Sequence, residues 1–355
     1  MKRVAIFCHN LLENGTVKAA LTQADLLSNF GCDVHLFLFE DRGLFSIPSN
    51  VNVHYLNFIK KESTSSKVDK LKKEIEFFEK SIGTFDLFLC NSTDCDLIVS
   101  HCELTNVYFF CHCALKEEFI MEAKRGPVHL YRKIKKIHAL RDKKLITVSK
   151  GLEKELTGYK WLKSKSIQTI YNPLDIDLIH KRMIIENPVI PTEPYMIYIG
   201  RVTKQKRLDV LFKAIKSMKN NLKLVILTNN NKKAFTLAKK YNVEERVILP
   251  GFQDNPYNWI ANAELMLLSS DFEGFGLVIA ESLICGTPVI STDCPYGPSE
   301  LLINNQKNFL VSVGDYNMLA KKTDECLLKP PLINLDDLNM FRGDVIVEQY
   351  LKLMD

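Results

Sequence analysis

The chain has 355 residues, of which 46% are apolar and 25% charged, with a net charge of +5. This composition is typical of a soluble globular protein of two domains and excludes a disordered or fibrous chain. No uncharged run is long enough to span a membrane, and the apolar run behind Lys2 and Arg3 is too short for a signal peptide. The ten cysteines show no repeated metal-ligand spacing. We therefore expect reduced thiols and a cytoplasmic setting.

The first half of the chain alternates short apolar runs with helical patterns. A strand is expected at 3–8, a loop through Asn14-Gly15, a helix at 17–30 that stops at Gly31, and a second strand at 34–39. Residues 60–80 have helical spacing, with a loop marked at 63–66. Further strands are expected at 85–90, 107–111, 145–148 and 169–173. This order indicates a parallel sheet.

The second half restarts the same alternation. Strands are expected at 196–199, 223–227, 247–249, 265–268 and 288–291, with helices at 208–218, 232–241, 256–261, from about Gly276, and near Pro298 and Met318. We therefore predict two doubly wound α/β domains, 1–172 and 173–340, with a helix within 341–355 packing back on the first. Three prolines in 184–194 support a boundary nearby. Ligands of such sheets bind at the carboxyl ends of the strands.

The stretch 271–281 joins the apolar strand 265–268 to a helix through two glycines. A helix that begins near Gly276 presents free N–H groups and its positive dipole end, which suit a phosphate or another anion. Glu273 and Glu281 supply carboxylates, which accept hydrogen bonds from sugar hydroxyls. The alternative interpretation is that Glu273 is a turn residue and Glu281 a solvated helix residue.

Two cations follow the strand 196–199 within one loop. Arg201 and Lys206 can both point toward a ligand there, and a departing diphosphate needs cationic donors as its negative charge grows. The alternative is a solvated basic turn.

Together these segments resemble the nucleotide-sugar half of the GT4 family of retaining glycosyltransferases. The segments are Gly200-Arg201 with Lys206, Pro250-Gly251-Phe252, the stretch 273–281, and 286–290. The resemblance extends to 148–151, to 171–173 and to the closing helix 341–351. It implies the GT-B fold, in which two Rossmann-like domains face a central cleft.

The resemblance also implies residue roles. Glu281 would hold the ribose hydroxyls, and Glu273 the transferred sugar. The turn of Gly274, Phe275, Gly276 and Leu277 would bind sugar and phosphate through its amides. The loop 250–254, with Phe252, would flank the base.

His112 ends a predicted strand, where the family often has a histidine that touches the donor sugar. Its neighbours Cys111 and Cys113 do not make a metal site with it, because adjacent strand residues point to opposite faces. A structural histidine is the alternative for His112, and His9 is interpreted as structural. Relatives often have a Gly-Gly pair and then Glu-Arg after the first strand. This chain has Gly15 alone, within 13–18, so the backbone approach to the diphosphate is expected to survive while the acceptor side differs.

The stretch that begins at Lys124 and ends at Lys144 holds nine basic residues and one acidic residue. With Leu130, Ile134 and Ile137 on one face, it reads as a basic amphipathic helix that contacts an anionic membrane surface. The alternative is a solvated helix that covers the first domain's sheet. Nucleic acid is not expected as a partner, because no aromatic residues interleave a basic groove.

The resemblance thus implies a transferase that moves a hexose or N-acetylhexosamine from a UDP-sugar donor to a glycan or glycolipid acceptor, with retention of anomeric configuration. GDP and ADP are the alternative donor nucleotides. The resemblance suggests lipopolysaccharide, lipooligosaccharide or capsule as the product. No metal cofactor is expected, since Asp94-Cys-Asp96 lies in the other half from the nucleotide loops. The enzyme would work in the cytoplasm, on the inner face of the membrane. The alternatives are a GT-B epimerase or phosphorylase, and a non-catalytic subunit of a transferase complex.

Overall fold

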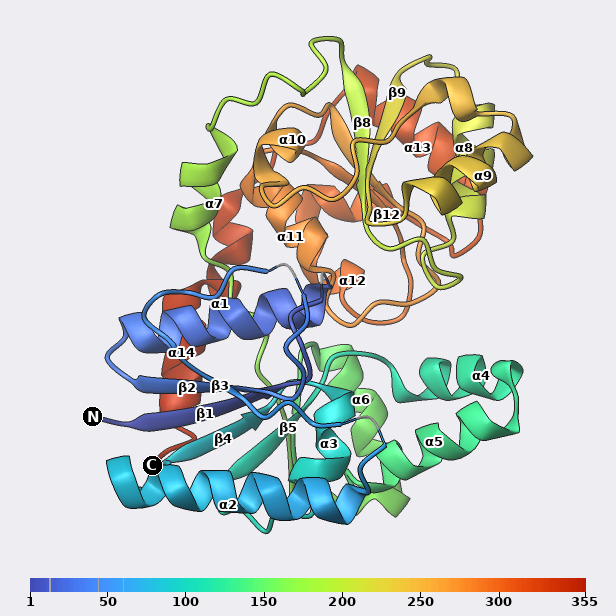
Figure 1. Cartoon of the computed structure of the whole chain (residues 1–355). Coiled ribbons are helices and arrows are strands. Elements are labelled where there is room, and N and C mark those ends of the chain that lie inside the picture. The colour runs from blue at the N-terminus through green and yellow to red at the C-terminus, as the bar shows by residue number, and fades with distance from the viewer. Residues whose placement is uncertain (13, 44, 60) are drawn as a thin grey trace. The chain divides into compact units, whose positions relative to one another are not determined.

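The computed structural model describes every residue except 13, 44 and 60 (Figure 1). Glu13, which opens the segment that departs from the family pattern, therefore lies outside the described residues. The chain divides into two compact units: Met1–Pro173 with Gly343–Asp355, and Leu174–Arg342. The observed division between Pro173 and Leu174 lies one residue after the boundary predicted between 172 and 173.

The first unit contains a seven-stranded sheet in the order β3-β2-β1-β4-β5-β6-β7, and all its pairings are parallel. The strands are β1 (Arg3–Cys8), β2 (Asp33–Leu38), β3 (Asn52–Tyr55), β4 (Leu87–Cys90), β5 (Val107–Cys111), β6 (Lys144–Thr147) and β7 (Ser166–Thr169). The strand predicted at 169–173 is wrong, since β7 ends at Thr169. The edge strand β3 was not predicted, because none of its four residues is buried.

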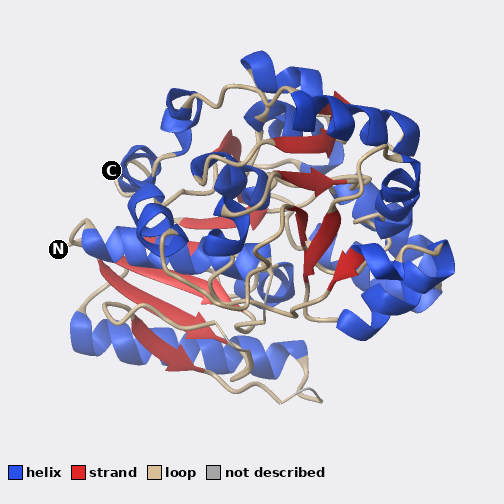
Figure 2. Cartoon of the chain, turned by 90° about the horizontal axis from the view of Figure 1, so that it is seen from above, coloured by secondary structure: helices blue, strands red, loops and turns tan. Residues whose placement is uncertain are grey.

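Helices lie on either side of this sheet (Figure 2). They are α1 (Gly15–Asn29), α2 (Thr64–Ile82), α3 (Thr93–Val99), α4 (Leu115–Arg125), α5 (Pro127–His138), α6 (Lys150–Thr157) and α14 (Gly343–Leu351). The loop predicted at 63–66 is wrong. Ser63 is instead the N-cap of α2, and its hydroxyl accepts a hydrogen bond from the Ser66 amide at 3.1 Å.

The single basic helix predicted from Lys124 onward is also wrong, because two helices meet there. Gly126 has φ +118°, a conformation that L side chains rarely adopt, and it ends α4. Pro127 then begins α5, where its missing N–H costs nothing. The result is a helical hairpin of α4 and α5 (Figure 1).

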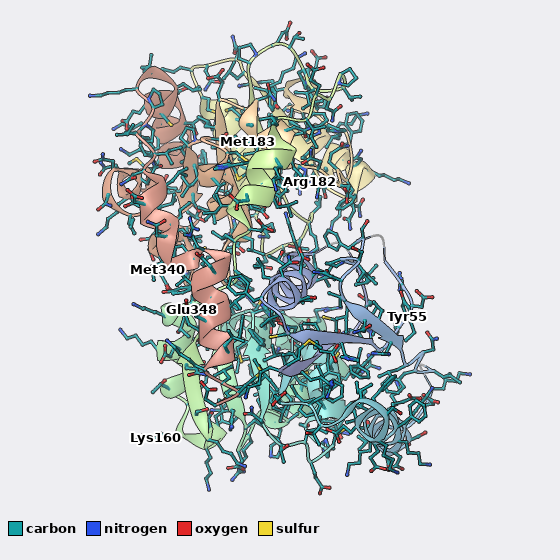
Figure 3. The ribbon with its side chains drawn as sticks, turned by 90° about the vertical axis from the view of Figure 1, so that its left-hand side faces the viewer. Tyr55, Lys160, Arg182, Met183, Met340 and Glu348 are labelled. Atoms are coloured by element: carbon teal, nitrogen blue, oxygen red, sulfur yellow. The ribbon has the colours of Figure 1, made fainter. Side chains whose placement is uncertain are left out.

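The last helix of the chain belongs to the first unit. Figure 3 labels Glu348 on α14, which runs beside the sheet. Its contact with α1 is tight, since a Cβ added to Gly343 would lie 2.7 Å from a Leu26 methyl group. Two hydrogen bonds tie the chain end down: Lys2 Nζ donates to Met354 O at 3.0 Å, and Asn106 Nδ2 donates to Leu353 O at 2.9 Å.

The second unit has a six-stranded parallel sheet in the order β10-β9-β8-β11-β12-β13. The strands are β8 (Tyr195–Ile199), β9 (Lys223–Leu227), β10 (Val247–Ile248), β11 (Leu265–Leu268), β12 (Val289–Thr292) and β13 (Leu310–Val311). The helices are α7 (Ile176–Met183), α8 (Leu208–Ser217), α9 (Asn231–Tyr241), α10 (Tyr257–Ala261), α11 (Leu277–Ile284), α12 (Pro298–Leu301) and α13 (Tyr316–Leu328). Figure 3 marks α7 at Arg182 and Met183.

Strand order locates the ligand-binding edge of each sheet. In the second unit the chain runs from β8 outward to β9 and β10, then returns to the other side of β8 as β11. In the first unit the same reversal separates β1 from β4. Ligands of doubly wound sheets bind outside the carboxyl ends of the strands at such a reversal. We therefore expect the ligand-binding groups on the loops after β8 and β11, and on those after β1 and β4.

Candidate active site

A cation and a carboxylate meet where the second sheet reverses. Lys206 lies between β8 and α8, Glu273 lies between β11 and α11, and β8 pairs with β11. Lys206 Nζ is 2.6 Å from Glu273 Oε1, and the two side chains are only 15% and 9% exposed. The structure thus brings together two residues that lie far apart in the sequence and were predicted as site residues separately.

Ser270 completes this cluster. Its hydroxyl donates to Glu273 Oε1 at 2.5 Å, so that oxygen accepts from both the serine and the lysine. The other carboxylate oxygen, Oε2, bonds to none of the described residues and is not among their buried unpartnered polar atoms. Glu273 therefore has one oxygen held in place and one available to a ligand.

A second set of bonds holds the two loops together. Gln205 Nε2 donates to Phe272 O at 2.7 Å, and the Asp271 amide donates to Gln205 O at 2.8 Å. Arg207 Nη1 lies 2.7 Å from Asp271 Oδ1. Ser269 Oγ donates to Lys206 O at 2.9 Å. The positions of Lys206 and Glu273 are thus determined by contacts on both sides of the pair.

Arg201 follows β8 and differs from Lys206 in its surroundings. It is exposed, and its carbonyl accepts a hydrogen bond from the Tyr198 hydroxyl at 3.4 Å. Burial raises the pKa of Tyr198, so this hydroxyl stays protonated. Of the two cations predicted as a diphosphate clamp, Lys206 is paired with a carboxylate and Arg201 faces solvent.

The turn between Glu273 and α11 has the geometry that its glycines predict. Gly276 is the N-cap of α11 with φ +90°, and no side chain caps the helix, so the predicted start near Gly276 is confirmed. Phe275 is buried, and its ring lies 5.2 Å from that of Phe341. A Cβ added to Gly297 would lie 2.2 Å from Phe275 O, so only glycine fits there. Gly274 and Leu277 flank this fixed turn.

Glu281 and Phe252 are the remaining predicted residues of the second unit. Glu281 is 3% exposed within α11, so the alternative of a solvated helix residue is wrong. Glu273 is likewise buried rather than an exposed turn residue. Phe252 is exposed and follows Gly251, which has φ +94°.

The loop after β12 contributes residues that the sequence did not single out. Pro295 O accepts a hydrogen bond from the Glu273 amide at 3.3 Å. Cys294 is buried nearby, and burial together with the Glu273 carboxylate raises the pKa of its thiol. Their only signal was position, since they follow the strand next to β11 in the sheet.

In the first unit, His112 lies at the carboxyl end of β5 within a chain of polar contacts. Asn91 Nδ2 donates to Gln23 Oε1 at 2.7 Å, and Asn91 Oδ1 lies 3.3 Å from His112 Nε2. This orientation of the amide makes Nε2 the protonated nitrogen of His112. Burial lowers the pKa of His112 to about 4, so the ring is neutral near pH 7.

Gly15 and His9 lie at the carboxyl end of β1. Gly15 is the exposed first residue of α1, and Asn14 is its N-cap, accepting from the Val17 amide at 3.0 Å. His9 Nε2 is 3.4 Å from Glu40 Oε1. The altered loop therefore still begins a capped helix.

Apart from positions 13, 44 and 60, no group of three or more His, Cys, Asp or Glu side chains is placed to hold a metal ion. All ten cysteines belong to the described residues, and they are reduced thiols outside any disulfide. Within the described part of the chain, no helix is both long and apolar enough to cross a bilayer.

The two doubly wound parallel-sheet units define the GT-B class of fold, and solved structures agree. The Anabaena protein HepE, in complex with UDP and glucose, superposes with a TM-score of 0.77 at 15% identity, covering 99% of each chain. Residues 181–337 match the family model of glycosyl transferases group 1. This part of the chain is therefore similar to that group of glycosyltransferases.

Curated relatives extend the comparison. The N-acetylgalactosamine-N,N'-diacetylbacillosaminyl-diphospho-undecaprenol 4-alpha-N-acetylgalactosaminyltransferase of Campylobacter jejuni is 28% identical over 341 residues, which are 90% of this chain and 88% of that enzyme. The lipopolysaccharide 1,6-galactosyltransferase of Escherichia coli K12 is 28% identical over 178 residues, about half of each chain at 48%.

Proposed function

We propose that the protein transfers a hexose or N-acetylhexosamine from a UDP-sugar to a lipid-linked surface glycan, with retention of anomeric configuration and without a metal. The observation that carries this proposal is the cluster of Lys206, Glu273 and Ser270 at the reversal of the second sheet. A carboxylate with one fixed and one available oxygen suits a sugar hydroxyl, and neighbouring cations suit a diphosphate.

The proposed roles follow from the surroundings of each group. Glu273 Oε2 accepts hydrogen bonds from hydroxyls of the transferred sugar. Lys206 and Arg201 stabilise the charge that grows on the departing diphosphate, together with the amides of Gly276 and Leu277 at the start of α11. Glu281 holds the ribose, and Phe252 flanks the base. In this proposal Glu273 orients the sugar through Oε2, while Oε1 is held by Lys206 and Ser270.

Retention follows if acceptor attack and diphosphate departure take place on the same face of the sugar. The leaving phosphate then takes the proton of the acceptor hydroxyl as the new glycosidic bond forms. His112, neutral and with Nε2–H directed at Asn91, has Nδ1 as its remaining acceptor for a sugar hydroxyl. No carboxylate nucleophile is required.

The choice of acceptor is supported by the relatives. The Campylobacter enzyme, by its name, acts on a glycan carried by diphospho-undecaprenol, and the Escherichia coli enzyme on lipopolysaccharide. UDP as donor is supported by the solved complex of HepE. An acceptor of this kind is reached at the cytoplasmic face of the membrane.

The test is product analysis with a panel of UDP-sugars and a membrane glycolipid extract. We expect one sugar to be incorporated, with an anomeric configuration by NMR that matches the donor, and undiminished turnover in a chelator. Inversion would refute retention, and loss of activity that Mg²⁺ or Mn²⁺ restores would refute metal independence. UDP release that does not depend on acceptor would favour an epimerase or hydrolase, and a requirement for free phosphate would favour a phosphorylase.

A further inference from the structure

The α4–α5 hairpin exposes a concentration of large apolar side chains. Phe119 and Ile120 on α4, and Val128, Tyr131 and Ile134 on α5, are between 38% and 59% exposed. We call these five residues the apolar set. Residues three apart lie on one face of a helix, so the three members on α5 form a stripe. Exposed apolar residues gathered in this way, unlike scattered ones, mark an interaction surface.

The charges around the apolar set are positive. The exposed charged residues of the hairpin are Lys116, Lys124, Arg125, Arg132 and Lys135. By contrast, the glutamates of α4 are all half-buried. Lys135 Nζ lies 5.0 Å above the Tyr131 ring, which places a cation directly beside the apolar stripe. The outward face therefore combines apolar side chains with cations.

Two lysines of the stretch 124–144 are held in ion pairs instead of being available on this surface. Lys133 is buried and its ammonium pairs with Glu118 of α4. Lys136 pairs with Asp94 of α3. These ion pairs hold the hairpin together and attach it to the first unit. They leave Lys124, Arg132 and Lys135 as cations that can meet a partner.

We propose that the α4–α5 hairpin binds an anionic lipid surface, with the apolar set entering the boundary between headgroups and acyl chains. The exposed cations then lie among the lipid phosphates. Tyrosine and lysine suit this position, because each has an apolar body and a polar tip. A charged surface with few apolar groups would bind only by electrostatics, whereas this one also loses apolar area to the membrane.

The hairpin lies next to the carboxyl edge of the first sheet, so its attachment would bring that edge close to the membrane. Helix α4 begins at Leu115, directly after β5 ends at Cys111, so the hairpin starts at the carboxyl edge of the first sheet (Figure 1). That edge holds His112. If the proposed function is correct, a lipid-linked acceptor is presented to this edge by the bilayer on which the hairpin rests. The attachment itself does not depend on the transferase assignment.

The experiment is co-sedimentation of the full chain with vesicles of phosphatidylcholine alone or mixed equally with phosphatidylglycerol. The apolar variant carries Ile120→Ser, Tyr131→Ser and Ile134→Ser. The charge variant carries Lys124→Gln, Arg132→Gln and Lys135→Gln. The matched control carries Phe77→Ser and Phe235→Ser, two aromatic residues exposed outside the hairpin.

We expect the wild type and the control to bind the anionic vesicles equally. The apolar variant should bind about tenfold more weakly at every salt concentration, and the charge variant should lose binding mainly at low salt, where screening is weak. Circular dichroism shows whether the variants are folded. Activity on a soluble acceptor should persist in both, so failure of the lipid proposal is distinguishable from failure of the proposed function.

Three results would overturn the proposal. One is wild-type binding to neither kind of vesicle, and another is an apolar variant that binds as well as the wild type. The third is a wild-type dimer in sedimentation velocity that the apolar variant abolishes, which would show that the set covers a second copy of the chain instead.

Discussion

The carboxyl edges of the two sheets differ in the charge of the polar side chains that they hold. In the second unit, the groups after β8 and β11 are charged and paired with each other, as Lys206 is with Glu273. In the first unit, the buried groups after β4 and β5 are largely neutral, while the more exposed Asp94 pairs with Lys136. His112 is uncharged and contacts the Asn91 amide, and the buried Asp96 has a pKa raised by burial to about 8. An edge of paired charges suits a diphosphate sugar, whereas an edge of neutral acceptors suits hydroxyl groups.

The two edges also differ in the residues that hold their polar side chains in position. Glu273 is held by a serine and a lysine on the adjacent loops, so its orientation does not depend on ligand. His112 depends on Asn91, which in turn depends on Gln23 of α1. The comparison therefore predicts that the charged edge tolerates less change than the neutral one.

The largest effect on turnover is expected from the charged edge. Lys206→Ala and Arg201→Ala should each lower kcat/KM by about 100-fold or more, because a charge-stabilising donor is lost. Only Lys206→Ala should also destabilise the protein, by about 3 kcal/mol, because it leaves a buried carboxylate without its cation. Arg201 is exposed, so its variant should unfold like the wild type.

A double-mutant cycle separates the two roles of Lys206. Urea unfolding of Lys206→Met combined with Glu273→Gln should recover most of the lost stability, while activity stays low. Near-normal kcat/KM in both single cation variants would remove the clamp assignment. Equal destabilisation by both would instead contradict the difference between a paired and a solvent-facing cation.

Ser270 should have the next largest effect. Ser270→Ala removes one of two donors to Glu273 Oε1 and should lower kcat by about tenfold, with the larger part of the change in kcat rather than KM. The matched control is Thr323→Val in α13, which likewise removes a buried hydroxyl, in this case one that donates to the Leu319 carbonyl at 2.8 Å. Both variants should lose similar stability in urea. If the two also lost activity alike, Ser270 would be structural only.

Most strands could be predicted because they are apolar runs buried in parallel sheets, and β1, β5, β9 and β11 have the predicted bounds. The loops that carry Lys206 and Glu273 could be located for the same reason, since each follows such a strand. The failures have equally local causes. Edge strand β3 exposes its side chains, and Gly126-Pro127 divides a segment whose charge pattern looked continuous.

Ion pairs between residues that lie far apart in the sequence could not be predicted from residue spacing. Nothing near Lys206 in the chain indicates that its ammonium lies on Glu273, and nothing near Lys133 indicates that it is buried against Glu118. Ser270 had a positional signal, since it follows the apolar strand β11 by two residues. Asn91 had the same signal after β4. Polar residues directly after buried strands are therefore worth treating as site candidates even without charge.

The neutral edge gives the third prediction. Asn91→Ala should lower kcat/KM severalfold by releasing His112, and Asn91→Ala with His112→Ala should cost no more than His112→Ala alone. Because burial lowers the pKa of His112 to about 4, kcat/KM should show no titration by this ring between pH 5.5 and 8. An inflection near pH 6.5 that vanishes in His112→Gln would show that the ring is not neutral in this way.

The smallest effect on turnover, and a clear one on stability, is expected from Asp96. This carboxyl group is buried, accepts a hydrogen bond from the Cys90 thiol at 3.2 Å, and has a pKa raised by burial to about 8. The unfolded chain releases this proton near pH 4, so between about pH 4 and pH 8 the folded state binds one proton more. Its contribution to the unfolding free energy therefore falls as pH rises through that window, on the order of 1 kcal/mol per pH unit. Asp96→Asn removes the titration. In urea unfolding, the stability of this variant relative to the wild type should therefore rise from pH 5 to pH 8, with unchanged kcat.

Asp94→Asn is the matched control: the neighbouring Lys136 lowers the pKa of Asp94 against the effect of burial, so this variant should lose stability relative to the wild type above pH 4. Parallel pH curves for Asp96→Asn and the wild type would show that Asp96 is ionised, and the edge of the first sheet would then be charged like that of the second.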